Sequence, residues 1–311
     1  MTPELFQEVE RVGGAVDLSA RTKLLLRGAD RVRYLNGQVT NDVRKATEGA
    51  AAIRACVTNA KGRIEADVFI HARGDETLCV DAEGVLRETL HARLDRYIVA
   101  DDVELNDISE EMRLWHFFGE AAKVLQQTPP TVGRYIVSAT RLGAPGGDVW
   151  IKQGQDLPRI DCPQLSATDL ETLRIVRGIP RWPTELNGEV FPQEAGLEAG
   201  AMDFFKGCYI GQEVLSRIKT TGKMPRVLVK WEMRDEAKSL VEQPNRLRLL
   251  AQVDGGVMKD IGHVTSACVH PLLDRGVGLG YVRQGFEAEH SLLLAHVDEP
   301  TIHHHVKIIR L

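Results

Sequence analysis

Hydrophobic and polar positions alternate with two different periods along the first part of the chain. Residues 15–29 begin with short segments of strand-like alternation, and residues 31–38 have the spacing of a helix that ends in an Asn- and Asp-rich turn. Residues 54–82 are typical of strands joined by turns at Asn59–Gly62 and Gly74–Asp75. This mixture predicts sheets covered by helices.

A longer helix is predicted over residues 82–99, because five apolar side chains keep to one side of it. They are Val85, Leu86, Leu90, Leu94 and Tyr97. Residues 101–109 then read as a strand that leaves this helix, and residues 146–152 as a hairpin strand.

Two further helices are predicted from their end signals. Thr2 can cap a helix that begins at Pro3, and acidic residues suit its first turn. The segment 166–180 has a capping-box spacing at Thr168 and Glu171, and Gly178 with Pro180 ends it.

The pattern changes after Pro225. From there to residue 311, short apolar segments with strand character are separated by turns, and no convincing helix remains. This predicts a separate all-β barrel or sandwich. We therefore divide the chain into residues 1–222 and residues 223–311.

Composition places the chain among ordinary globular proteins and excludes some function classes. It has 311 residues, 43% hydrophobic and 27% charged, with a net charge of −5, which gives no support to nucleic-acid binding. No apolar run approaches the roughly 18 residues of a membrane helix, and the N-terminus lacks a signal-peptide pattern. We therefore expect a cytoplasmic protein that binds neither membrane nor nucleic acid directly.

The five cysteines are widely spaced and form no CxxC pair. A zinc or iron–sulfur cage made by this chain alone is therefore disfavoured, and we expect no metal site. A reducing compartment fits this cysteine usage. One cysteine could still act alone.

The stretch KGCYIGQEV, residues 206–214, holds the most informative cysteine. Gly207 and Gly211 permit unusual backbone conformations, and a helix is predicted from Gly211 onward. Its apolar face would hold Val214, Leu215 and Ile218, and Glu213 with Arg217 has the spacing of a favourable pair. Cys208 precedes this helix and lies close to Lys206, and both features favour a reactive thiolate. A small buried thiol in a Gly-rich turn remains an equal alternative.

Three other groups of polar residues are weaker candidates. Glu194, in FPQEAGLE, could accept hydrogen bonds from a ligand, although a helix cap or surface charge is the commoner role. Glu65 and Asp67 share one face of a charged hairpin that is more simply solvated. His303 and His305 also share a face, but without further ligands an exposed edge strand is favoured over a metal site.

Nucleotide-binding glycine loops, a Walker loop, HExxH and GxSxG motifs are all missing from the sequence.

The stretch from Lys206 to Glu213 resembles the K-G-C-Y-x-G-Q-E signature of the YgfZ family of folate-binding proteins and matches all its fixed positions. YLNGQVTNDV and KGRIEAD resemble earlier segments of the family, and FPQEAGL resembles a segment shared with the glycine-cleavage T-protein, an aminomethyltransferase. Residues 262–283 resemble the C-terminal barrel of that superfamily, so the resemblance covers nearly the whole chain.

The resemblance implies an α+β fold, a three-part ring of two mixed α/β units and a C-terminal β-barrel around a central channel. It also implies binding of tetrahydrofolate or a derivative, and a role in the assembly or repair of iron–sulfur proteins and, through them, of tRNA-modifying enzymes, with iron–sulfur proteins or their assembly factors as partners. Cys208 is then the key thiol. We expect the folate site to include Glu194, Lys206, Tyr209, Gln212 and Arg217.

One departure from the T-protein pattern affects the expected chemistry. T-proteins carry an Asp-Asp pair where Ala66 and Asp67 stand here, so one carboxylate is missing. Asp67 remains a candidate catalytic residue. The alternative function is a folate-dependent aminomethyl or one-carbon transferase, and a scaffold that only retains the folate fold is a third interpretation.

Overall fold

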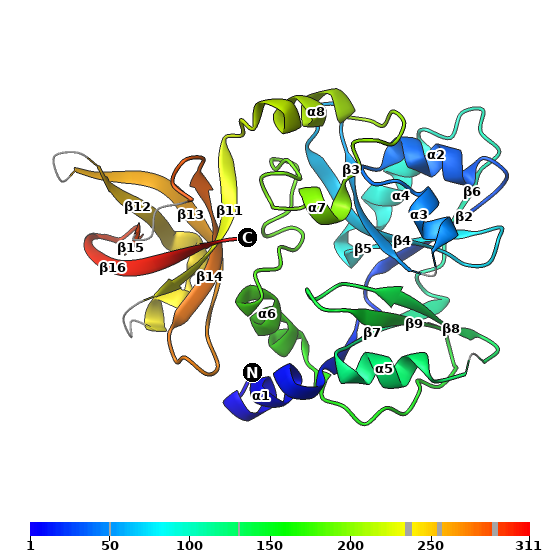
Figure 1. Cartoon of the computed structure of the whole chain (residues 1–311), viewed down its shortest axis with the longest axis horizontal. Helices are drawn as coiled ribbons and strands as arrows, with labels where there is room; N and C mark the ends of the chain where they lie inside the picture. Colours follow the sequence, from blue (N-terminus) through cyan, green and yellow to red (C-terminus); the bar gives the residue numbers. More distant parts are fainter. Residues whose placement is uncertain (50, 130, 234–237, 254–256, 288–291) are drawn as a thin grey trace.

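The structure is a computed structural model that describes residues 1–49, 51–129, 131–233, 238–253, 257–287 and 292–311. It consists of two five-stranded sheets with their helices and a closed six-stranded barrel. In Figure 1 the barrel lies on the left and the two sheets lie on the right, one above the other. The α+β fold of two mixed units and a C-terminal barrel is confirmed.

The first sheet has helices on one face. Its strands, in spatial order, are β3 (Ile53–Thr58), β4 (Ile64–Ala72), β5 (Leu78–Ala82), β2 (Thr22–Arg27) and β6 (Glu104–Asp107). The helices are α2 (Arg31–Gln38), α3 (Arg44–Glu48) and α4 (Arg87–Asp95), the last preceded by the 3₁₀ turn η1 (Gly84–Leu86). Leu35, Leu90 and Leu94 from these helices bury against the sheet in a continuous apolar core.

The second sheet takes its strands from separate parts of the chain. In spatial order they are β10 (Gln164–Leu165), β1 (Gly14–Asp17), β7 (Met112–Phe118), β9 (Gly146–Lys152) and β8 (Arg134–Ala139). Three helices accompany it, namely α1 (Pro3–Val12), α5 (Glu120–Gln126) and α6 (Ala167–Val176). Leu25 and Cys79 of the first sheet pack against Leu114, Val137 and Trp150 of the second, so the two sheets share a core.

The barrel closes in the order β11, β14, β13, β12, β15, β16. Its strands are β11 (Arg226–Met233), β12 (Leu247–Val253), β13 (Val257–Val269), β14 (Gly276–Arg283), β15 (Leu292–His296) and β16 (Glu299–Arg310), with the 3₁₀ turns η2 (Lys238–Glu242) and η3 (Pro244–Arg246). Because the barrel is closed, its described strands have no open edge. Of the two predicted forms, barrel and sandwich, the barrel is the one that forms. The division at residues 222 and 223 stays a prediction.

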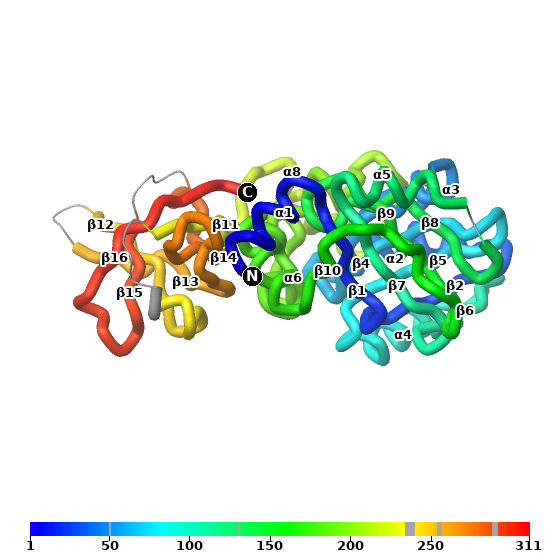
Figure 2. Tube along the Cα trace, turned by 90° about the horizontal axis from the view of Figure 1, so that it is seen from below, coloured from blue at the N-terminus to red at the C-terminus, as the bar shows by residue number. Residues whose placement is uncertain are grey.

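A segment with little regular structure joins the three parts. It follows α6 and contains α7 (Glu198–Ala201) and α8 (Gln212–Thr221) before the barrel begins. Leu186, Val190 and Leu197 of this segment bury against the first sheet and against Leu228 and Leu279 of the barrel. Figure 2 shows that both chain ends lie in this middle region, between the barrel and the sheets.

The local predictions that rest on end signals are mostly confirmed. Thr2 caps α1, with its hydroxyl accepting from the Leu5 amide at 3.2 Å, and the helix at residues 31–38 forms as α2. The capping box of α6 lies two residues earlier in the chain than the predicted pair of Thr168 and Glu171. Ser166 and Asp169 form it, because the helix begins earlier, and Glu171 pairs with Arg174 instead.

Two other predictions need correction. The helix predicted over residues 82–99 is regular only from Arg87 to Asp95, so Val85 and Tyr97 lie outside it and are 72% and 40% exposed. His303 and His305 are exposed, but β16 pairs with β15 and β11 and is not an edge strand. No helix among the described residues has the length and apolar character that a membrane crossing requires.

Candidate functional site

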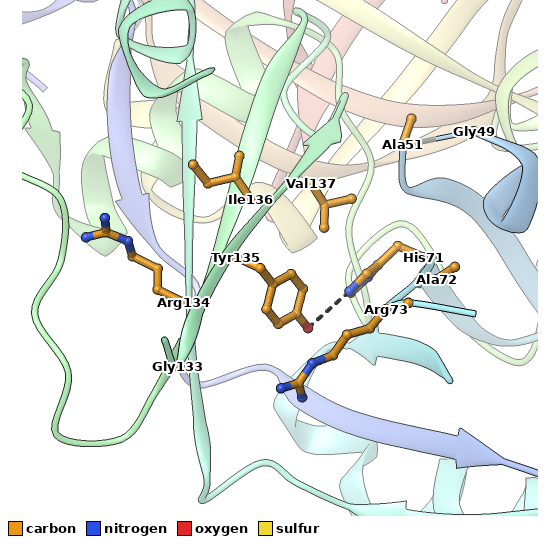
Figure 3. A pocket seen from close by; sticks show the side chains of 11 residues that line it. Gly49, Ala51, His71, Ala72, Arg73, Gly133, Arg134, Tyr135, Ile136 and Val137 are labelled. Atoms are coloured by element: carbon orange, nitrogen blue, oxygen red, sulfur yellow. Dashed lines mark hydrogen bonds between the residues drawn. The ribbon is translucent and has the colours of Figure 1, made fainter. Parts of the chain in front are cut away.

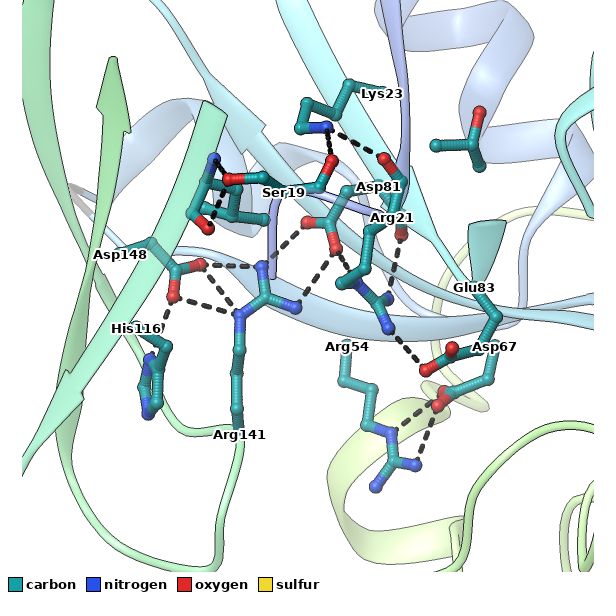
Figure 4. Close-up of polar contacts among 12 residues, drawn as sticks. Ser19, Arg21, Lys23, Arg54, Asp67, Asp81, Glu83, His116, Arg141 and Asp148 are labelled. Carbon is teal, nitrogen blue, oxygen red and sulfur yellow. Dashed lines mark hydrogen bonds and ion pairs between the residues drawn. The ribbon is translucent and has the colours of Figure 1, made fainter. Parts of the chain in front are cut away.

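A central cavity of about 560 Å³ lies where the two sheets meet α6. Strands β1, β3, β4 and β7 contribute to its wall, together with residues 141–142 and the segment after α6. Its charged and imidazole side chains are Asp17, Arg21, Arg54, Asp67, Glu83, His116, Arg141, Glu171, Arg174 and Arg181. Apolar side chains such as Val16, Phe69 and Leu142 complete the wall, and Figure 4 shows that Arg21 pairs with Glu83 and Arg54 with Asp67.

Arg141 joins the two sheets through a buried ion-pair network. Its guanidinium binds both carboxylate oxygens of Asp81 on β5, at 3.0 and 2.7 Å, and both of Asp148 on β9. Burial alone would raise the pKa of each carboxyl group, but the charge of Arg141 outweighs it and holds both values below their usual range. Arg21 adds a second pair to Asp81. Two fully buried anions are thereby compensated, and the cavity wall is fixed.

His116 belongs to the same network and was not found from the sequence. Its Nδ1 lies 2.8 Å from Asp148 Oδ1, while its Nε2 is buried and has no hydrogen-bond partner among the described residues. The ring needs the glycine at position 146, because a Cβ there would lie 2.5 Å from His116 Cε1. A carboxylate that holds Nδ1 fixes the orientation of the imidazole. The only sequence signal for it is one histidine in a strand.

Asp67 lies in this cavity wall, but both of its oxygens are occupied. Arg54, on the neighbouring strand β3, donates from Nε to Oδ1 and from Nη2 to Oδ2, each at 2.8 Å. Such a two-pronged pair is strong and directional. Each oxygen of Asp67 thus already accepts a hydrogen bond from Arg54. In the β3–β4 hairpin Cys56 lies opposite Asp67, so Arg54, two residues away on β3, lies diagonally opposite Asp67. This register indicates Arg54 as the partner of Asp67.

Glu194 lies outside the set of residues that line the central cavity. Its side chain is fully buried where the joining segment meets the barrel, and its carbonyl accepts from the Leu228 amide. Oε2 accepts from the Phe191 amide at 2.9 Å and lies 3.4 Å from Arg63, while Oε1 lies 3.5 Å from Arg226. Oε1 has no hydrogen bond to any described residue, and burial raises the pKa of the carboxyl group.

Lys206 acts as a buried anchor for the signature stretch. Its ammonium group donates to the carbonyl oxygens of Asn36, Val39 and Asn41, at 2.5, 2.7 and 2.8 Å, and it lies over the Tyr209 ring. Burial lowers the pKa of Lys206 to about 7. All three of its donors are used to fix the turn after α2, and no contact with the Cys208 sulfur accompanies them in the described structure.

Cys208 is exposed, which excludes the interpretation as a small buried thiol. Lys206, two residues before Cys208, and Tyr209, directly after it, are buried, while Gly207 between them is exposed; Ile210 bonds to Gly37 and Thr58. The thiol is therefore presented at the surface by a segment that is fixed at both ends. Cys208 lies four residues before the first residue of α8, farther from the helix start than expected.

The remaining predicted site residues lie around α8. Tyr209 packs with Leu215 and Ile218; its hydroxyl has no described partner, and burial raises its pKa to about 12. Gln212 is the first residue of the helix, and Arg217 is exposed. Among the described residues no ion pair joins Glu213 to Arg217. The structure therefore brings the signature residues together. Asp67 lies apart from them in the wall of the central cavity, and Glu194 lies where the joining segment meets the barrel.

Comparison with protein families and curated proteins gives consistent relatives. The GCVT N-terminal domain matches residues 4–132. An iron-sulfur cluster assembly factor, the mitochondrial IBA57 homolog of Chaetomium globosum, is 28% identical over 67% of this chain and 54% of its own length. The tRNA-modifying protein YgfZ of Colwellia psychrerythraea is 27% identical over 68% of this chain and 69% of its own. The chain thus spans about half the length of the IBA57 homolog.

Two aminomethyltransferases match almost the whole chain. That of Rubrobacter xylanophilus is 27% identical over 93% of this chain and 81% of its own length. The solved structure of the glycine cleavage system aminomethyltransferase T from Bartonella henselae superposes with a TM-score of 0.78, over 99% of this chain and 88% of that one. At 14% identity, that likeness concerns the fold alone.

Proposed function

Because the chain belongs to the superfamily that unites YgfZ with the glycine-cleavage aminomethyltransferases, we propose that it is a tetrahydrofolate-binding accessory protein for the assembly or repair of iron–sulfur clusters. Cys208 is its key thiol. The partners are iron–sulfur proteins or their assembly factors, including those that serve tRNA-modifying enzymes, and the setting is the cytoplasm. The similarity to an IBA57 homolog, an iron-sulfur cluster assembly factor, and to the tRNA-modifying protein YgfZ supports this direction.

The observation that carries the proposal is the presentation of Cys208. The thiol is exposed, whereas the anchors beside it are buried and fixed by hydrogen bonds to the α2 turn. A thiol can act on another protein only if that protein can reach it. The rigid mounting lowers the entropy cost of meeting a partner in one defined geometry.

Glu194 provides the feature that fits a folate. Its Oε1 is a buried acceptor without a hydrogen bond to any described residue, and the aminopyrimidinone edge of a pterin offers N–H donors. When bound, tetrahydrofolate would supply a one-carbon carrier and a reducing ring. Glu194 would orient the ring, and Arg63 and Arg226 partly offset the effect of burial on the pKa of its carboxyl group. The roles of Lys206, Tyr209, Gln212 and Arg217 toward folate stay predictions.

The alternative, aminomethyl or one-carbon transfer, has less support from the site. Ala66 replaces one carboxylate of the T-protein pair, and Arg54 occupies both oxygens of Asp67. A transferase needs a group that can accept or stabilise a proton near the reacting nitrogen. Formation of 5,10-methylenetetrahydrofolate from tetrahydrofolate and an aminomethyl-lipoyl carrier would nevertheless favour this alternative.

The test is complementation of a null strain by Cys208→Ala, with the activity of a cluster-dependent enzyme measured under oxidative stress. We expect activity close to that of the null strain, because the exposed thiol is lost while the buried anchors remain. Cys162→Ala is the matched control, since Cys162 is only partly buried and lies in the core of the second sheet. Full rescue by Cys208→Ala would remove Cys208 from the function.

A further inference from the structure

A second cleft, of about 400 Å³, follows one edge of the second sheet (Figure 3). The consecutive residues 133–137, most of β8, form one wall. The end of β4 and the turn after it, residues 71–74, form the other wall together with Gly49 and Ala51. None of the residues assigned above to folate or to thiol chemistry lines this cleft.

The β8 wall is a strand edge that is only partly paired, because Ser138 forms a bridge with Ala51 and the Arg134 amide donates to the Thr131 carbonyl. The Gly133 carbonyl accepts from the Lys152 amide at 2.7 Å, so Gly133, Tyr135 and Val137 are the residues bonded to β9. The residues between them turn their backbone groups outward. The Ser138 carbonyl accordingly leaves the sheet and accepts from the Ala52 amide at 2.7 Å.

Ile136 has the same outward orientation as Ser138, because it lies two residues away on the same strand. No described residue forms a hydrogen bond with its N–H or its C=O. A strand edge with unpaired backbone groups is a template for another strand. The cleft therefore offers both backbone partners and space beside them.

The charge of the cleft is positive and uncompensated. Arg73 lies over the Tyr135 ring, 5.0 Å from its centre, and forms no ion pair with a described carboxylate. Arg134 also lines the cleft, but its guanidinium points away from Tyr135 and donates to the Pro129 carbonyl (Figure 3), and no Asp or Glu is among the described residues of the wall. His71 binds the Tyr135 hydroxyl at 3.2 Å, and burial lowers the pKa of His71 to about 4, so the imidazole is neutral near pH 7.

We propose that this cleft docks an extended acidic segment of a partner protein, which adds to β8 as a further strand and places a carboxylate against Arg73. Main-chain bonds to Ile136 would provide affinity, and Arg73 would select for negative charge. At about 3.3 Å per residue, residues 133–137 accommodate a segment of about five residues. The proposal does not depend on folate binding.

The test uses a defined probe, an acetylated and amidated peptide of seven residues in which Glu alternates with Val and Thr. Binding to the full chain is measured by calorimetry and by NMR shifts of the β8 amides. We expect the Glu peptide to bind at least tenfold more tightly than the same peptide with Lys in place of Glu. N-methylation of the amides along one peptide edge should abolish binding, because it removes the strand pairing.

Two variants locate the site. Ile136→Pro should weaken binding at least tenfold, yet fold, because the lost N–H bonds to nothing in the sheet and edge strands tolerate proline. Arg73→Gln should weaken binding about fivefold, as expected for an exposed charge pair. Arg11→Gln makes the same charge change on α1 and should have no effect.

Three outcomes would overturn the proposal. They are no binding of the Glu peptide at millimolar concentration, equal binding of the Glu and Lys peptides, and binding that N-methylation leaves unchanged. The N-methylated peptide is tested on the unaltered chain, so this arm remains decisive even if Ile136→Pro does not fold.

Discussion

Asp67 and Glu194 are both buried carboxylates, but their oxygens differ in what they already bind. Both oxygens of Asp67 accept charge-assisted bonds from Arg54, whereas Glu194 keeps one oxygen without a hydrogen bond to a described residue. An unsatisfied buried acceptor is costly for folding and is therefore expected where a ligand completes it. At the scale of single residues, Glu194 therefore has an oxygen without a hydrogen bond to a described residue and Asp67 does not, although Asp67 is the one that lines the central cavity.

Glu194→Gln is therefore expected to weaken tetrahydrofolate binding about tenfold or more, because the new amide can place a donor against the donors of the ligand. Calorimetric titration with tetrahydrofolate measures this. The native chain should also lose stability as pH rises from about 4.5, since burial raises the pKa of Glu194 above the unfolded value. Below about pH 4.5 Glu194 is protonated in both the folded and the unfolded chain, so the cost of burying its charge vanishes. In Glu194→Gln this pH dependence of stability should be missing. Unchanged folate affinity would remove Glu194 from the site.

At the scale of elements, Arg141 holds β5 and β9 together. Arg141→Met would leave Asp81 and Asp148 buried with less compensation, which costs roughly 3–5 kcal/mol at pH 7. In the native chain both carboxyl pKa values are lowered, so their stabilisation is present at neutral pH and is lost only as pH falls below about 3.8.

In the Arg141→Met variant the two pKa values should rise with burial, so protonation should reduce the penalty as pH falls toward 4. Urea unfolding at pH 7 and pH 4.5 tests this: the difference in unfolding free energy between native chain and variant should be largest at pH 7. Arg177→Met is the control, because Arg177 pairs with the exposed Glu10. An equal loss at both pH values would contradict the proposed role of the charges.

The same network shows how far the sequence could lead. Elements with local signals, such as the Thr2-capped α1, α2, β9 and the barrel strands, were predicted correctly. The superfamily signature located Cys208. Arg141 binds Asp81 across a separation of 60 residues, and no local pattern indicates such a partner. For the same reason the sequence did not reveal the buried anchoring of Lys206, whereas the Arg54–Asp67 pair lies within one hairpin and follows from its register.

Across the whole molecule, the barrel and the sheets are coupled through the segment that follows α6. Leu186 of this segment is fully buried in a core that it shares with Ile64 of β4 and with Leu228 and Leu279 of the barrel. Tyr281 of the barrel also donates from its hydroxyl to the Glu185 carbonyl at 2.8 Å. The barrel, the first sheet and this segment therefore share one apolar core, and its loss should weaken the coupling of the barrel to the first sheet, while Val277 of the barrel keeps a second apolar contact with Val16 and Phe118 of the second sheet.

Leu186→Ala is expected to cost about 2–5 kcal/mol, as other buried leucine truncations do. The truncation leaves a cavity between the barrel and the first sheet. We therefore expect the single calorimetric transition of the native chain to split in two, with the barrel and the sheets unfolding at different temperatures. Leu24→Ala is the matched control: Leu24 is equally buried, but lies inside the core of the first sheet. It should lower the temperature of the transition but leave it single, because the contacts between the barrel and the sheets remain. A transition that stays single in Leu186→Ala would show that this core does not link the barrel to the sheets.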